Sequence, residues 1–550
     1  MPSVSFKDIL SGSTEEGLRR SSQRLYALGR GLWVPEEESR RLAVPGLALP
    51  QRLGTPEKTS PAPIDFVAIF ITLDDYLETP EPPSESAGSL VEEIVTSHDP
   101  HVLLAQLAFL GRLAEKPQEA KRLATGYSDL LRPDLKDAFE SSMRRGREEG
   151  VETHLVSRQG ALAAMRVVFE AGAWGQGEFE APTLATSILL VHAVSAGMSE
   201  IRGNAGKYIG ETPAGLMMEM VRNGLFNHKD DEYSVIDRAL RYWQDLAKSP
   251  MRTPLRAAPH ELLEEALGGV GFEELFALGL RLWTHAKRWT DATLKHPSEV
   301  SRPMTLPVGL TDIAIERRAV NEFLGRMAAK PEWFARKFEG RESEYDFLPF
   351  QARPVVHIGD ELLVLDETYL LQKFTTLGLF WAVHDNERDN HAPRDRLRWN
   401  QAHGELVEDL VTERLREMAP VASDRPGGRS FYSEDDMKDV YPGSRVGDAA
   451  VDYGDYFLLF EVTGGQPVVD TRVAGDPQKF REDTEKLVLE EAEQLHAACE
   501  SLLADQKLLT GYDPSANRRI LPIVVVGGGY PADALSRSHV DDFLAQKGWL

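Results

Sequence analysis

The chain has very little cysteine: Cys499 is the only one among 550 residues. A single cysteine cannot form an intramolecular disulfide or a zinc site built from several thiolates. Such low cysteine usage suits a reducing compartment, so we expect a cytoplasmic protein. Cys499 lies on an apolar helix face, which favours packing over nucleophilic chemistry.

Long apolar runs are also missing. The longest uncharged one, residues 184–198, is shorter than the roughly 20 residues that cross a bilayer, and it contains His192. The first residues do not show the basic segment followed by an apolar one that marks a secretory signal. We therefore expect no membrane partner and interpret 184–198 as a buried helix.

Positive charge is scarce relative to negative charge. The chain has 62 Lys and Arg against 87 Asp and Glu, a net charge of −25, and no block of basic residues dominates. This argues against a broad basic face that binds nucleic acid non-specifically, although a narrow basic strip remains compatible with the total.

The length and the apolar pattern predict several domains. A chain of 550 residues exceeds what one hydrophobic core usually holds. Residues 1–62 include a proline-rich stretch and predict an arm or linker. In residues 63–345 apolar positions recur with helical spacing, which predicts an α-helical domain that can contact a protein partner or self-associate.

The remaining chain predicts two further segments. Residues 346–400 predict a hairpin with its turn at Gly359, followed by one connecting helix. Residues 401–550 predict a C-terminal domain in which 521–526, a continuous apolar run, forms a strand at the centre of a sheet.

A second hairpin is predicted within residues 447–465, GDAAVDYGDYFLLFEVTGG, with its turn around Gly454. Asp448 opens the first arm, and Glu461 lies inside the apolar second arm. A carboxylate in a buried strand must be paired, protonated or bound to a metal. Two carboxylates on neighbouring strands can share a hard divalent cation such as Mg²⁺.

These residues carry a resemblance to a known family. Asp448, twelve intervening residues and then Glu461-Val462-Thr463 resemble the PD-(D/E)XK motif of restriction-endonuclease-like nucleases. The expected order around the motif is a helix at 404–418, strands, a helix at 477–505 and the strand at 521–526, which resembles the family's α-β-β-β-α-β core.

The resemblance covers about the last 150 residues and implies a fold class. We expect an α+β multidomain protein, with a large α-helical N-terminal region followed by a C-terminal α/β restriction-endonuclease-like domain that has a small mixed central sheet.

The resemblance also implies a site. Asp448 and Glu461 would be the ligands of Mg²⁺ or Mn²⁺, and Glu405 matches a glutamate of the family's first helix that adds a ligand or a supporting contact. The alternative role of Glu405 is to favour its helix N-terminus electrostatically. Thr463 stands where the motif has lysine, and Lys486 on the next helix is a candidate replacement, unless it is an ordinary solvated lysine.

Two functions follow from the resemblance. The first is metal-dependent hydrolysis of phosphodiesters in DNA or RNA, in bacterial defence or nucleic-acid processing. The second is a catalytically inactive descendant that works as a binding or scaffold subunit with a partner protein, because Thr463 removes the motif cation.

Overall fold

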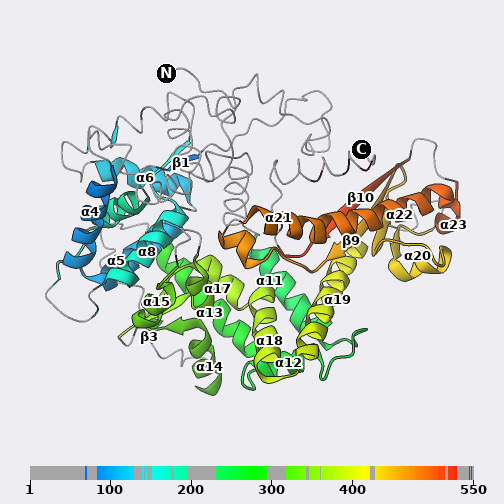
Figure 1. Ribbon diagram of the computed structural model, residues 1–550, viewed down its shortest axis with the longest axis horizontal. Coiled ribbons are helices and arrows are strands. Elements are labelled where there is room, and N and C mark those ends of the chain that lie inside the picture. Colours follow the sequence, from blue (N-terminus) through cyan, green and yellow to red (C-terminus); the bar gives the residue numbers. More distant parts are fainter. Residues whose placement is uncertain are drawn as a thin grey trace. The chain divides into compact units, whose positions relative to one another are not determined.

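The computed structural model describes part of the chain. The described residues are 68–70, 83–114, 116–128, 152–172, 179–195, 231–293, 306–307, 317–341, 346–359, 361–421, 428–474, 476–513 and 518–528, with a few isolated positions besides. The predicted arm or linker at 1–62 lies outside them. The described chain is mostly helical with small sheets, so its class is α+β (Figure 1).

The chain divides into two compact units whose boundaries differ from the predicted domains. The first unit combines 1–227 with 277–373, and the second combines 228–276 with 374–550. Residues 228–276, expected within the 63–345 helical domain, therefore belong with the C-terminal sheet. The predicted single connecting helix is two helices, α17 (Glu367–Lys373) and α18 (Thr376–Asn390), and the unit boundary falls between them.

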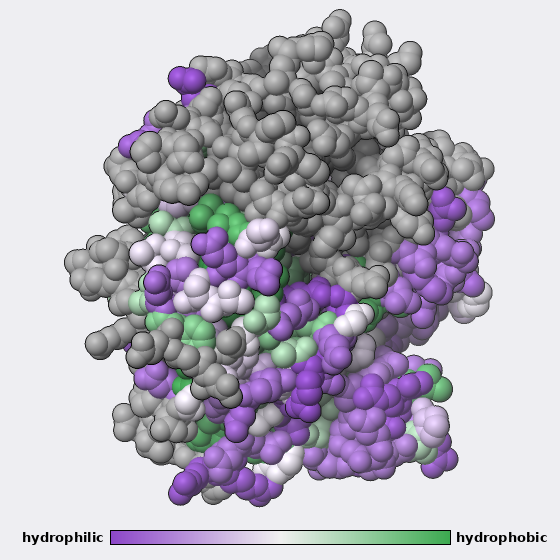
Figure 2. Space-filling model, turned by 60° about the vertical axis from the view of Figure 1, so that its left-hand side comes forward, coloured by the Kyte–Doolittle hydropathy of each residue, from purple (hydrophilic) through white to green (hydrophobic). Residues whose placement is uncertain are grey.

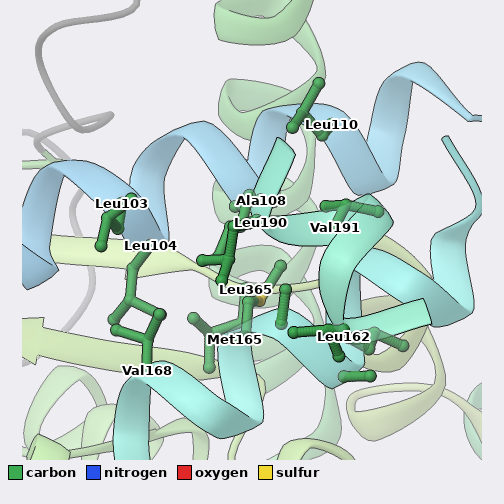
Figure 3. Packing of buried hydrophobic residues seen from close by; sticks show 14 of the residues in the cluster. Leu103, Leu104, Ala108, Leu110, Leu162, Met165, Val168, Leu190, Val191 and Leu365 are labelled. Carbon is green, nitrogen blue, oxygen red and sulfur yellow. The ribbon is translucent and has the colours of Figure 1, made fainter. Parts of the chain in front are cut away.

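The first unit is built around two packed helices, α5 (Pro100–Leu113) and α8 (Arg158–Ala171). The side chain of Asp99 caps α5 by accepting from the N–H of His101 at 2.9 Å, and Pro100 occupies the first turn, where its missing N–H costs nothing. Leucines of α5 interleave with apolar residues of α8 (Figure 3). Residues 184–195 are helical, and Leu190 is fully buried, which confirms the expected buried helix over its described part.

Other elements complete the first unit. Its other labelled helices are α4 (Pro83–Ser97), α6 (Pro117–Ser128), α14 (Arg317–Met327), α15 (Pro331–Phe338), α16 (Leu348–Ala352) and most of α13 (Phe272–Thr293). One small sheet pairs β1 (Ala68–Phe70) with β2 (Glu152–His154) in parallel. A second sheet has the order β3 (Leu306–Pro307), β6 (Glu361–Val364), β5 (Val355–Ile358) and β4 (Ala328–Ala329). The predicted hairpin is confirmed as β5–β6, with Gly359 at φ 59° in its turn.

The second unit contains the candidate site. Its sheet has the order β10 (Arg519–Val526), β9 (Tyr456–Thr463), β8 (Ala449–Asp452) and β7 (Phe431–Ser433). The strands β7, β8 and β9 are antiparallel neighbours, whereas β10 runs parallel to β9. The hairpin predicted around Gly454 is confirmed as β8–β9, and Gly454 adopts φ 87° in the turn.

Besides α18, the second unit contains further helical segments. They are α11 (Glu232–Leu240), η2 (Arg241–Asp245), η3 (Leu246–Lys248), α12 (Pro259–Ala266), α19 (Pro393–Met418), α20 (Glu434–Val440), η6 (Asp470–Ala474), α21 (Pro477–Thr484), η7 (Glu485–Leu489), α22 (Glu490–Ala504) and α23 (Gln506–Thr510). Leu459 packs in one apolar cluster with Leu495 of α22, and Phe460 packs in another with Leu415 of α19. The two long helices thus cover opposite faces of the sheet, because successive strand residues alternate in direction.

The strand β10 departs from expectation. It was predicted at the centre of a sheet, but among the described strands it pairs only with β9 and lies at the edge. Its residues are exposed or half-buried, and Leu521 is 40% exposed. Pro522 lacks an N–H for a further ladder, and an edge strand tolerates this. Apolar composition alone did not distinguish an edge from a centre.

On the face drawn in Figure 2, the described residues are mainly hydrophilic, and apolar residues form only small groups. None of the described helices combines the length and apolar composition required to traverse a bilayer.

Candidate functional site

Asp448 and Glu461 lie at the same end of the β8–β9 hairpin. The paired register of β8 and β9 begins at Ala449 opposite Phe460, and Asp448 directly precedes it. The Asp448 carboxylate reaches the backbone N–H of Val462, the residue that follows Glu461. Along β9, Glu461 shares its side with Leu459, which packs under α22. The structure therefore brings together the two carboxylates that the sequence predicted as ligands.

The backbone around Gly447 fixes the position of Asp448. The N–H of Asp448 donates to the carbonyl of Phe460 at 2.9 Å, and a Cβ on Gly447 would lie 2.7 Å from that same carbonyl oxygen. Only glycine allows such a close approach. The carboxylate of Asp448 also accepts from the N–H of Val462 at 2.7 Å. Asp448 is consequently held against the strand that carries Glu461.

Glu461 is a buried carboxylate that lacks a hydrogen-bond partner at Oε2 in the described structure. The residue is only 7% exposed. Burial, together with the negative charge of Asp448, raises the pKa of Glu461 to about 9. Burial also raises the pKa of Asp448 to about 7, against the opposing effect of the Val462 hydrogen bond. An ionised carboxylate in such a place is costly unless a cation compensates it.

Three more carboxylates surround this pair. The negative charges of Glu408 in α19, Glu434 in α20 and Glu491 in α22 all contribute to the raised pKa values of Asp448 and Glu461. All three side chains are half-buried. We call the five residues the acidic group. It concentrates negative potential at one end of the hairpin, and this favours a cation.

Gly464 lets α19 approach the end of β9. A Cβ on Gly464 would lie 3.0 Å from the Cα of Gly404, so the two backbones pass close to each other. Glu408 follows Gly404 by four residues and hence lies on the same side of the helix, one turn further on. This contact explains how Glu408 belongs to the acidic group although its helix is distant in sequence from the hairpin.

A cation from an earlier segment reaches this group. Arg252, in the loop between η3 and α12, bonds through Nη2 to Glu408 Oε2 at 2.5 Å, and its Nη1 lies 3.7 Å from Glu434 Oε2. The Arg252 side chain is 58% exposed. Lys438 also pairs with Glu434, at 2.5 Å.

Glu405 supports this loop. Its carboxylate accepts from the N–H groups of Arg252 and Thr253, at 2.9 and 3.2 Å, and from the Thr253 hydroxyl at 2.6 Å. The contacts of Glu405 thus anchor the loop, whereas Glu408, one turn later, is the α19 glutamate whose charge acts on Asp448 and Glu461.

Thr463 and Lys486 lie in different surroundings, because Thr463 is near Glu491 whereas Lys486 is exposed to solvent. The Thr463 hydroxyl accepts a hydrogen bond from the N–H of Gly465 at 3.4 Å. Burial raises the pKa of the nearby Glu491, whereas the hydrogen bond that Glu491 accepts from Gln494 at 2.8 Å and the Thr463 hydroxyl both lower it. Lys486 is exposed on η7. Its neighbour Leu487 is instead buried and packs where a Cβ on Gly465 would lie.

The carboxylates of the candidate site can be compared with the ligands that a divalent cation requires. No group of three or more His, Cys, Asp or Glu side chains among the described residues converges on a single ion position. However, Mg²⁺ commonly uses only one or two carboxylates and keeps several waters. Asp448 and the unpartnered Oε2 of Glu461 fit this arrangement. The residues present therefore suit a hydrated Mg²⁺ or Mn²⁺ better than an ion enclosed by protein ligands.

Reasoning from sequence missed Glu408, Glu434, Glu491 and Arg252. Glu408 had a detectable signal, since it lies one turn after Glu405 on a helix already assigned to the site. Glu434 and Arg252 had none, because only the fold brings their segments to the hairpin.

Comparisons with protein-family models, curated proteins and solved structures found no match to this chain.

Proposed function

We propose that this chain is a nuclease-like protein that uses Mg²⁺ or Mn²⁺ to hydrolyse phosphodiester bonds of DNA or RNA. The observation that carries the proposal is the buried carboxylate of Glu461, unpartnered at Oε2 among the described residues, beside Asp448, whose carboxylate bonds to the N–H of the next residue, Val462. The ionised form of such a buried carboxylate needs compensation, and a hard divalent cation is chemically matched to it.

The order of elements in the second unit supports the proposal. The chain runs through α19, β7, β8, β9, the α21–α22 helical stretch and β10, with the short helix α20 between β7 and β8. This succession corresponds to the α-β-β-β-α-β core that the motif resemblance implies. Asp448 directly precedes β8 and Glu461 lies near the end of β9, and these positions support the motif resemblance.

Each residue of the site would have its own role in hydrolysis. Asp448 and Glu461 would hold the cation, which when bound supplies a nucleophilic water at neutral pH and offsets charge on the phosphate. The Val462 N–H keeps the Asp448 carboxylate oriented. Glu408, Glu434 and Glu491 increase the local negative potential, so the pair releases its protons readily only when a cation replaces them.

A cleavage assay tests this function. Supercoiled plasmid, linear single-stranded DNA and RNA are incubated with Mg²⁺ or Mn²⁺ and with the wild type, Asp448→Ala or Glu461→Gln. We expect cleavage by the wild type alone, and its loss on chelation of the metal. Equal cleavage by all three proteins would mean contamination, and no cleavage of any substrate would contradict the proposed enzyme.

A second candidate function is a catalytically inactive binding subunit with the same fold. It is favoured by Thr463, which stands where the motif would have a lysine and offers Glu491 a neutral hydroxyl that lowers its pKa but no positive charge. Under this alternative, the protein binds metal or nucleic acid but leaves every phosphodiester intact.

A further inference from the structure

Basic side chains form a stripe along one side of α13. Arg281, His285 and Arg288 are all exposed, whereas Leu282 and Ala286 on the other side of the helix are fully buried. Positions that are four and then three residues apart lie above one another on a helix, so the three basic side chains share one face. We call Arg281, His285 and Arg288 the α13 stripe.

The two arginines of the stripe have no carboxylate partner within the described part of the chain. Asp291, the acidic residue of α13 that follows Arg288, pairs instead with Lys116. The two glutamates of the helix, at positions 273 and 274, precede Arg281 by at least seven residues, which is about 10 Å along the axis. The positive charges of Arg281 and Arg288 are thus not neutralised by their own helix.

Other exposed arginines of this acidic chain do have carboxylate partners. Arg388 bonds to Asp389 at 2.8 Å, and Arg414 bonds to Glu417 at 2.9 Å. With a net charge of −25, the chain has more than enough carboxylates to pair its arginines. The α13 stripe is therefore the kind of narrow basic strip that the composition leaves room for.

His285 lies between the two arginines and responds to both. Partial burial lowers the pKa of His285, and the positive charges of Arg281 and Arg288 lower it further. The imidazole is consequently neutral near pH 7 and offers a hydrogen bond rather than a charge. The charge of the stripe at neutral pH comes from its two guanidinium groups.

We propose that the α13 stripe binds the phosphodiester backbone of nucleic acid. A guanidinium donates two parallel hydrogen bonds to a phosphate, and Arg281 and Arg288 lie about 10 Å apart along the helix, so each engages a phosphate of its own. A nucleic-acid backbone repeats its negative charge at every nucleotide and has no cation of its own, which suits two unpaired arginines. This inference goes beyond the proposed function, because binding at the stripe requires neither a metal nor the Asp448–Glu461 pair.

The test measures binding of fluorescently labelled single-stranded and duplex DNA to the full chain by anisotropy, at several salt concentrations. EDTA is present throughout, so that metal binding and cleavage do not contribute. The variants are Arg281→Gln, Arg288→Gln and the double variant. Arg394→Gln on α19 is the matched control, because it removes the same charge from a side chain that is 75% exposed but lies beside Asp395. Circular dichroism verifies that each variant is folded.

We expect each single variant to weaken binding about threefold to tenfold at low salt, and Arg394→Gln to change it by less than about twofold. The double variant should also have a less steep dependence of log K on log salt concentration. The expected difference from the wild type is about 1.4 for single-stranded DNA and about 1.8 for duplex, because two phosphate contacts are lost.

Several results would overturn the inference. If the wild type binds neither DNA in EDTA, or if the double variant keeps the affinity and salt dependence of the wild type, the stripe is not a nucleic-acid surface. An equal loss in Arg394→Gln would reflect net charge alone. Displacement of DNA by poly-glutamate at equal charge concentration would assign the stripe to acidic peptides instead. None of these outcomes bears on metal-dependent cleavage, which the assay with Asp448→Ala and Glu461→Gln tests separately.

Discussion

The carboxylate of Asp448 accepts a hydrogen bond from the backbone N–H of Val462 at 2.7 Å. The bond links the residue that opens the hairpin to the strand position immediately after Glu461. It satisfies a main-chain donor and orients the carboxylate at the same time. One side chain thereby has a structural role and a proposed ligand role, and these can be separated by substitution.

Replacing Asp448 separates the two roles. Asp448→Ala leaves the Val462 N–H without its acceptor, and we expect a loss of about 1–2 kcal/mol in the free energy of unfolding. Asp448→Asn keeps an oxygen acceptor and should lose less than half of this. Urea unfolding followed by circular dichroism measures both. Equal stability of the two variants would mean that the hydrogen bond contributes nothing.

Stability should depend on pH through Glu461. Its pKa is raised from 4.5 to about 9, so the folded state retains a proton that the unfolded state releases. The stabilisation is complete below about pH 4.5 and is lost as the pH rises through 9.

Glu461→Gln should therefore lose less stability than the wild type between pH 5 and pH 9. At the upper end we expect its midpoint of thermal unfolding to exceed that of the wild type by at least about 2–4 °C, the equivalent of about 1 kcal/mol. Glu500→Gln, which changes an exposed carboxyl, is the control. Parallel pH profiles for Glu461→Gln and the wild type would contradict the buried, unpaired state of this carboxylate.

Gly447 should not accept a side chain. A Cβ there would lie 2.7 Å from the Phe460 carbonyl oxygen, so Gly447→Ala must displace the start of β8. We expect a cost of about 1–3 kcal/mol, with weaker metal binding because Asp448 moves. Gly404→Ala is the control, since its Cβ would meet nothing within 4 Å and alanine favours a helix. Similar stability of both variants would show that the backbone adapts without cost.

Local patterns predicted the secondary structure of the second unit well. The alternation around Gly454 gave the β8–β9 hairpin, and the apolar runs gave α19, α22 and β10 with shifted ends. They did not give the edge position of β10, because a continuous apolar run describes composition and not the number of neighbouring strands.

Long-range assembly was not predictable from these patterns. Helical spacing in residues 228–276 is the same whether the segment packs in one unit or the other, so its place beside the C-terminal sheet could not be foreseen. The assignment of Glu405 shows the same limit within the candidate site. Its helix was identified, but its partners Arg252 and Thr253 come from a segment more than 150 residues earlier.

Glu405 should behave as an anchor for the loop. Glu405→Ala removes three hydrogen bonds to Arg252 and Thr253, and we expect a loss of about 1–3 kcal/mol in the free energy of unfolding. Glu405→Gln keeps an acceptor oxygen and should fall between this variant and the wild type. If Glu405→Gln instead abolished Mn²⁺ binding while the protein remained stable, Glu405 would be a direct ligand, as the motif resemblance implies.

The most direct test of the account is a calorimetric titration of Mn²⁺ into the wild type and Glu461→Gln at pH 7, repeated in buffers with different ionisation enthalpies. We predict one binding site in the wild type, with net proton release, because Asp448 and Glu461 have pKa values raised to about 7 and 9 and must lose protons to coordinate a metal. Glu461→Gln should show neither the binding nor the proton release. The same binding isotherm for both proteins would contradict the assignment of Asp448 and Glu461 as a cation site.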